Sequence, residues 1–121
     1  MKHVLIGGVS SYIGTALKMR LSALSDRFTA EAVSLRGASL DALDFHGKDA
    51  VVLVAAIVHQ KERPEMAALY RAVNCDLALA AARKAKAEGV RHFVFFSTMA
   101  VYGKITGAIT RDTVAEPVTL Y

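Results

Sequence analysis

The first fourteen residues, MKHVLIGGVSSYIG, constrain the fold more than any other stretch of the chain. The run from His3 to Ile6 is short, apolar and partly β-branched, which indicates a buried strand, and it breaks at Gly7-Gly8. Helical periodicity begins at Tyr12. Glycine permits positive φ and lets a ligand approach the backbone, and the N–H groups that open the next helix attract an anion. This order of strand, glycine turn and helix predicts a place for a pyrophosphate.

The glycine spacing is typical of a dinucleotide-binding loop. Gly8 and Gly14 stand six residues apart, like the outer glycines of the motif G-x-x-G-x-x-G, and Ser11 occupies the middle position. The Ser11 hydroxyl could donate to a phosphate oxygen, although serine is less suited than glycine to a positive φ. Ser10 or Ser11 would also make a good N-cap, so an ordinary turn before a helix is the alternative.

Apolar patterns farther along the chain alternate between strand and helix. A helix from residue 13 is followed by a strand at 29–35, an apolar run at 49–56, a helical stripe from Met66 to Gly89 and a buried strand at 93–96. Residues 38–48 are too few for a full strand and crossover, so the usual third strand is expected to be abbreviated. The order predicts an α/β fold, a Rossmann-type open parallel sheet with helices on both faces. The carboxyl ends of its strands would form one ligand-binding edge.

The composition describes one soluble globular domain of 121 residues, 54% of them hydrophobic and 21% charged. No apolar run approaches a membrane span and the N-terminus lacks a secretory pattern, so we expect no membrane association and a cytoplasmic location. The net charge of +4 is spread from Lys2 to Arg111, which argues against nucleic acid as a partner. Cys75, the only cysteine, is expected to be a buried, inert thiol. The histidines have no spacing that suggests a metal site.

The stretch from Phe93 to Gly103, FVFFSTMAVYG, resembles the extended short-chain dehydrogenase/reductases of the nucleotide-sugar epimerase/dehydratase family. Members of that family carry a strand ending in Ser-Ser or Ser-Thr, a few small or apolar residues, and then Val-Tyr-Gly. Four further features agree in order: the glycine loop, the strand end Val54-Ala55-Ala56, Val73-Asn74 in the long helix, and residues 110–121. The resemblance spans the chain and implies the N-terminal, dinucleotide-binding part of such an enzyme, incomplete at the C-terminal side and without the substrate domain.

The resemblance implies a set of site residues. Thr98 takes the place of the active-site Ser/Thr, with capping of the following loop as its alternative role. Tyr121 takes the place of the catalytic tyrosine in Tyr-x-x-x-Lys, and the lysine is absent from the chain. Asn74 faces the cofactor or, equally, bonds a nearby loop. The residues expected around the cofactor are Gly8, Ser11, Tyr12, Ile13, Gly14, Arg36, Ala55, Ala56, Asn74 and Ser97.

The end of the second predicted strand bears on the choice of cofactor. An acidic residue there would hydrogen-bond the ribose 2′-hydroxyl of NAD, but this chain has Ser34-Leu35-Arg36. An arginine can pair with the 2′-phosphate of NADP, so the sequence favours NADP(H) over NAD(H). The alternative is a solvated arginine.

The reaction that the resemblance implies is hydride transfer at a sugar carbon, with proton transfer assisted by Tyr121 and Thr98. A tyrosine with a pKa of about 10 is a poor base at neutral pH, and the lysine that assists it is missing here. The expected parent is an NAD(P)-dependent nucleotide-sugar epimerase, dehydratase or reductase that forms a homodimer. No turnover is expected of the 121-residue chain, because terminal Tyr121 would not be held in place. An exposed apolar surface is also expected. The alternatives are a non-catalytic NAD(P)-sensing or scaffold module and, on the glycine turn alone, a methyltransferase.

Overall fold

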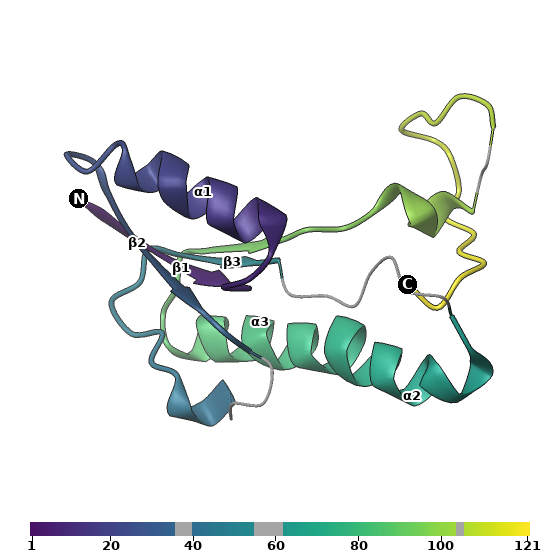
Figure 1. The fold of residues 1–121 in the computed structure, drawn as a ribbon, viewed down its shortest axis with the longest axis horizontal. Coiled ribbons are helices and arrows are strands. Elements are labelled where there is room, and N and C mark those ends of the chain that lie inside the picture. The colour runs from purple at the N-terminus through teal and green to yellow at the C-terminus, as the bar shows by residue number, and fades with distance from the viewer. Residues whose placement is uncertain (36–39, 55–61, 104–105) are drawn as a thin grey trace.

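The structure, a computed structural model, describes residues 1–35, 40–54, 62–103 and 106–121. Within these residues four parallel strands form one sheet in the order β2-β1-β3-β4 (Figure 1). The strands are β1 (Lys2–Gly7), β2 (Phe28–Val33), β3 (Ala50–Leu53) and β4 (His92–Phe95), and the α-helices are α1 (Tyr12–Ser22), α2 (Ala67–Tyr70) and α3 (Leu77–Ala87). Helix α1 lies on one face of the sheet and α3 on the other, so the predicted Rossmann-type fold is confirmed.

The described residues between β2 and β3 agree with the expectation of an abbreviated third strand. After β2, the described part of the connection to β3 holds one 3-10 turn, Leu40–Ala42, and no strand. Phe45, which follows this turn, is 1% exposed and packs beneath the sheet. The short segment therefore contributes a core side chain in place of a strand.

The long helix predicted after β3 is continuous but not uniform. It begins with a 3-10 turn at Pro64–Met66, continues through α2, widens into a π-helical stretch at Arg71–Asp76, and ends with α3. Proline suits the first turn because it has no N–H to leave unpaired. Gly89, with φ of 78°, ends the helix as expected. A π turn inserts an extra residue per turn and is frequent at functional sites, and nothing in the apolar pattern indicated it.

The sheet buries side chains on both faces because successive residues of a strand point in opposite directions. On the α3 face, Leu5 and Val51 pack with Phe45 and Ala85. On the α1 face, the core contains Val4, Ile6 and Val52, against which α1 packs its apolar stripe, Leu17 and Leu21. The central strands β1 and β3 are thus buried on both sides, as their continuous apolar sequences predicted.

A strand lies at His92–Phe95, close to the predicted 93–96, but the prediction that this strand is buried was wrong. Val94, Phe95 and Phe96 are 43%, 52% and 46% exposed. The reason is their place in the sheet: β4 is an outer strand, paired with β3 on one side only, and α1 packs against β1 and β2 rather than over β4. An apolar run reveals that a strand favours burial, but not which element covers it. The expected exposed apolar surface therefore lies along this strand.

The strands end together at one edge. Gly7 pairs with both Val33 and Leu53, and Leu53 pairs with Phe95, so the four carboxyl ends are in register. Residues 97–103 and 106–121 extend beyond this edge, where the chain forms a 3-10 turn at Met99–Tyr102 and then a tail (Figure 1). The glycine loop opens at the same edge. None of the described helices is both long and apolar enough to span a bilayer.

Candidate functional site

The loop between β1 and α1 is closed by Ser11. The Ser11 N–H and Oγ donate to the carbonyl oxygen of Gly8 at 3.2 and 3.0 Å, and Ser11 Oγ accepts from the Gly14 N–H at 2.8 Å. Gly8 has a φ of 138°, which favours glycine, whereas Ser11 has an ordinary φ of −76°. Serine is therefore unstrained at the middle position of the motif, and it serves as the N-cap of α1.

Gly14 allows α1 to approach the strand ends closely. A Cβ atom at this position would lie 2.5 Å from the Gly8 carbonyl oxygen, 2.5 Å from Ser11 Oγ and 3.1 Å from a methyl group of Val54. Two of these distances are far below van der Waals contact, and one neighbour is backbone that cannot rotate away. Packing thus requires glycine at position 14, and this close approach fixes the start of α1 against the sheet edge.

The start of α1 is open to solvent. Tyr12 is 91% exposed and Ile13 is 46% exposed, and the first turn contains no acidic residue. The N–H groups of a first helical turn have no partner within the helix, and the helix dipole makes this end partly positive. The five predicted loop residues Gly8, Ser11, Tyr12, Ile13 and Gly14 therefore come together at a surface suited to an anion such as a pyrophosphate.

Thr98 caps the turn that follows β4. Its Oγ1 accepts a hydrogen bond from the Ala100 N–H at 3.1 Å, and its neighbour Ser97 is exposed. The capping role considered for Thr98 is thus present. It is compatible with a chemical role, because accepting this bond leaves the hydroxyl proton available for donation. Gly103, with φ of 63°, ends the turn, and a Cβ there would lie 2.1 Å from the carbonyl oxygen of Glu116, so the tail packs directly against this loop.

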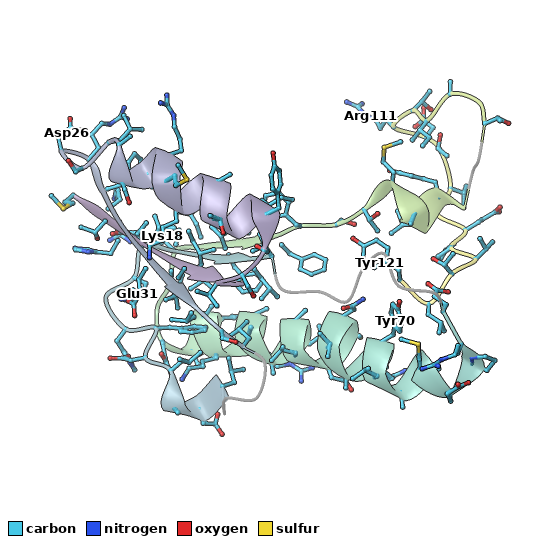
Figure 2. All side chains as sticks on the ribbon, viewed as in Figure 1. Lys18, Asp26, Glu31, Tyr70, Arg111 and Tyr121 are labelled. Carbon is cyan, nitrogen blue, oxygen red and sulfur yellow. The ribbon has the colours of Figure 1, made fainter. Side chains whose placement is uncertain are left out.

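Tyr121 lies at a cavity of about 420 Å³ between the long helix and the tail. The buried Tyr70 lines the same cavity, and Figure 2 shows the two tyrosines near each other. The carboxylate of Glu62 accepts from the N–H groups of Leu120 and Tyr121 at 3.0 and 3.1 Å, which tethers the tail. The cavity is lined by Ala67, Tyr70, Arg71, Asn74, Cys75, Leu120 and Tyr121. Sequence reasoning missed Glu62, since no local signal marks a carboxylate whose partners lie 58 and 59 residues away.

The π-helical stretch contains two residues about which the sequence made predictions, Asn74 and Cys75. Asn74 lines the cavity together with Tyr121. Cys75 is exposed, so the expectation of a buried thiol was wrong. Cys75 does not lie on the helix face that buries Tyr70 and Ala81. The apolar residues next to it in the sequence did not indicate this orientation. The predicted cofactor contacts Arg36, Ala55 and Ala56 lie outside the described residues.

The parallel sheet and the serine-closed glycine loop at its carboxyl edge define a Rossmann-type nucleotide-binding fold. A family model described as the NAD dependent epimerase/dehydratase family matches residues 4–121. The chain therefore belongs to the NAD dependent epimerase/dehydratase family, as the Ser97 to Gly103 segment indicated, and the methyltransferase alternative is set aside. A comparison with curated protein sequences gave no match.

Solved structures share the fold. A UDP-glucuronic acid 4-epimerase from Bacillus cereus, in complex with NAD, has a TM-score of 0.80 and 19% identity, covering 98% of this chain and 47% of that one. A short-chain dehydrogenase/reductase superfamily protein from Agrobacterium tumefaciens, with bound NAD, has a TM-score of 0.79 and 24% identity, covering 98% and 40%. A UDP-glucose 4-epimerase has a TM-score of 0.79 and 24% identity, covering 99% and 43%. The chain thus spans less than half the length of these proteins.

Proposed function

We propose that this chain is the NAD(P)-binding part of an enzyme that epimerises, dehydrates or reduces a nucleotide-activated sugar. The observation that carries the proposal is the loop in which Ser11 joins Gly8 to Gly14 and leaves the start of α1 exposed at the strand ends. Family membership supports it, as do similar structures that are complexes with NAD or with UDP-glucose and NAD.

The chain's residues divide the binding task along the sheet edge. A bound nicotinamide dinucleotide would supply the hydride acceptor and donor. Gly8 and residues 11–14 would hold its pyrophosphate through backbone N–H groups and the helix dipole. Arg36 would contact the 2′-phosphate of the adenosine ribose, which favours NADP(H), and Ala55-Ala56 would lie beside the inner ribose. The roles of these last three residues rest on the sequence.

Thr98 and Tyr121 would serve the proton transfer. Thr98 retains a hydroxyl proton after capping its turn, and Glu62 restrains the backbone at Tyr121. Asn74 lines the same cavity as Tyr121. A cytoplasmic homodimer is our expectation for the complete enzyme.

A fluorescence titration with NADPH, and separately with NADH, tests the proposal. We expect tighter binding of NADPH, and we expect Arg36→Ala to remove the preference while Arg83→Ala, an exposed arginine on α3, leaves it unchanged. Tighter binding of NADH would keep the dinucleotide site and contradict the role of Arg36. Binding of neither would contradict the proposal.

The alternative of a non-catalytic NAD(P)-sensing or scaffold module shares the cofactor site and differs in the chemistry. The coding sequence downstream of Tyr121 discriminates between the two. A lysine four positions after Tyr121 would complete the motif and favour the enzyme. Another residue at that position would favour the sensor.

A further inference from the structure

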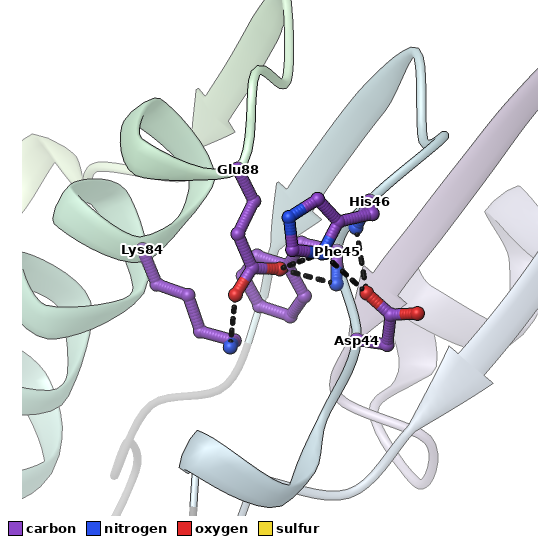
Figure 3. A network of polar contacts seen from close by, with 5 residues as sticks. All are labelled: Asp44, Phe45, His46, Lys84 and Glu88. Carbon is purple, nitrogen blue, oxygen red and sulfur yellow. Dashed lines mark hydrogen bonds and ion pairs between the residues drawn. The ribbon is translucent and has the colours of Figure 1, made fainter.

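A polar cluster of Asp44, His46 and Glu88 lies near the amino ends of β3 and β4, the edge opposite the glycine loop, and Figure 3 shows its contacts. Asp44 and His46 belong to the segment that leads into the amino end of β3, and Glu88 follows α3 just before the amino end of β4. No sequence pattern groups these residues, because Glu88 is 42 positions beyond His46. The fold brings one imidazole and two carboxylates together.

The three groups converge on one point. His46 Nδ1 lies 2.8 Å from Asp44 Oδ1 and 3.5 Å from Glu88 Oε2, and all three potential ligand atoms lie within 4.8 Å of one another. Zinc binds nitrogen and oxygen at about 2.0–2.2 Å, so its ligand atoms in a tetrahedral site are separated by about 3.3–3.5 Å. The 2.8 Å separation is below that range and the 3.5 Å separation lies at its upper end, and small rotations of the exposed Asp44 and His46 side chains would suffice to adjust them.

Glu88 is oriented by contacts outside the cluster. Its Oε1 pairs with Lys84 Nζ, and its Oε2 accepts from the Phe45 N–H at 2.7 Å. Lys84 in turn lies 5.4 Å from the centre of the Phe45 ring. The Glu88 side chain is only 15% exposed, so Oε2 is held facing His46 (Figure 3). Partners of this kind fix a metal ligand in place and are a recurrent part of metal sites.

The charges of the cluster suit a divalent cation. Asp44 and Glu88 supply two carboxylates, and Lys84 supplies one ammonium group that pairs with Glu88. With a neutral imidazole, the two carboxylates and Lys84 leave one net negative charge. Asp44 and His46 are largely exposed, which leaves room for an ion and its water ligands. Mixed imidazole and carboxylate ligands favour zinc-like ions over magnesium or calcium.

We propose that Asp44, His46 and Glu88 form a binding site for a divalent transition-metal ion of the Zn²⁺ type, with water completing its coordination. The ion would bind His46 Nδ1 and tie the segment before β3 to the end of α3. This site departs from the expectation that the histidines bind no metal. It is independent of the proposed nucleotide site, which lies at the other edge of the sheet.

Calorimetric titration of a Cys75→Ser protein with Zn²⁺, and separately with Mg²⁺, tests the site. The serine background removes the exposed thiol as a competing ligand. We expect saturable zinc binding at one site per chain and no comparable binding of Mg²⁺. His46→Ala and Glu88→Gln should each weaken zinc binding at least about tenfold. His92→Ala, which removes an exposed histidine at the start of β4, should leave it unchanged.

Thermal unfolding provides a second readout. Because an ion that binds only the folded chain stabilises it, Zn²⁺ should raise the Tm of the Cys75→Ser protein but not of its His46→Ala variant. Circular dichroism without metal establishes that the variants are folded. Absence of zinc binding at millimolar metal, or binding that survives His46→Ala and Glu88→Gln, would overturn the proposal.

Discussion

Ser11 and Gly14 hold the start of α1 together, the Oγ of Ser11 accepting the N–H of Gly14 at 2.8 Å. The same hydroxyl donates to the carbonyl oxygen of Gly8, so one side chain connects both outer positions of the glycine motif. A third glycine at position 11 would leave these groups without that partner. The serine therefore gives the loop a fixed shape while its backbone stays in an ordinary conformation.

The first prediction concerns Ser11. Ser11→Ala removes the cap and should lower the free energy of unfolding by about 1 kcal/mol, whereas Ser11→Gly should cost only a few tenths. Urea unfolding of the two variants and of the unsubstituted chain measures these differences in the free energy of unfolding. Equal losses for alanine and glycine, or no loss, would contradict the role of the hydroxyl. Because Ser11→Gly restores the three-glycine motif, this variant should still bind NAD(P)H.

The second prediction concerns Gly14. In Gly14→Ala the new methyl group meets the Gly8 carbonyl oxygen and Ser11 Oγ at 2.5 Å, so the loop must move. Overpacking outweighs the better helix propensity of alanine, and we expect a net loss of about 1–2 kcal/mol together with weaker nucleotide binding. Thr15→Ala, at the exposed next position, is the matched control and should change stability by less than about 0.5 kcal/mol. Similar unfolding midpoints for the two variants would contradict this packing.

Local chemistry decided what could be predicted from the sequence. Three features specify a local conformation through residues close in the sequence. They are the apolar run of β1, the glycines after it and the serine before α1. The parallel order followed because strands alternated with helical stripes. The carboxyl-edge site followed from that order.

Contacts between distant segments account for what could not be predicted. Phe95 and Phe96 looked buried, and their exposure depends on which helix covers β4. Glu62 meets Tyr121 across 59 residues, and His46 meets Glu88 across 42. Neither pairing leaves a periodic or local trace. The π turn likewise changes the spacing of the long helix without a distinctive residue type.

The third prediction concerns pH. Asp49 Oδ2 accepts the His3 N–H at 2.8 Å, and this bond, with help from Lys2, lowers the pKa of Asp49. A lowered folded-state pKa contributes stability above the unfolded pKa of about 4, and that stability is lost as the pH falls through the folded value. Asp49→Asn should therefore lower Tm at neutral pH, with the difference from the parent shrinking below about pH 4.

Thermal unfolding across this pH range measures the effect of Asp49. Lys2→Ala serves as the control because it removes only a 3.4 Å ion pair with an exposed lysine and keeps the bond from His3. Its effect should be smaller than that of Asp49→Asn. A constant Tm difference between Asp49→Asn and the parent at every pH would contradict the account.

The fourth prediction concerns the exposed face of β4. Val94 pairs in register with buried Val52, and Phe96 follows on the same face, so the apolar surface continues from the core to the outer strand. We expect the chain to self-associate with rising concentration, and Phe96→Lys to reduce the association. Val118→Lys alters an equally apolar but separate exposed side chain in the tail and should have little effect. If the unsubstituted chain is a monodisperse monomer in sedimentation velocity, this expectation is contradicted.

The central claim, that a nicotinamide dinucleotide binds at the glycine loop, is tested most directly by following backbone amide NMR signals during titration with NADPH. We expect the signals of Gly8 and residues 11–14 to shift together and saturate, while those of Phe45 and Glu88 at the opposite edge stay in place. Saturable shifts confined to other parts of the chain, or no shifts at all, would contradict the claim.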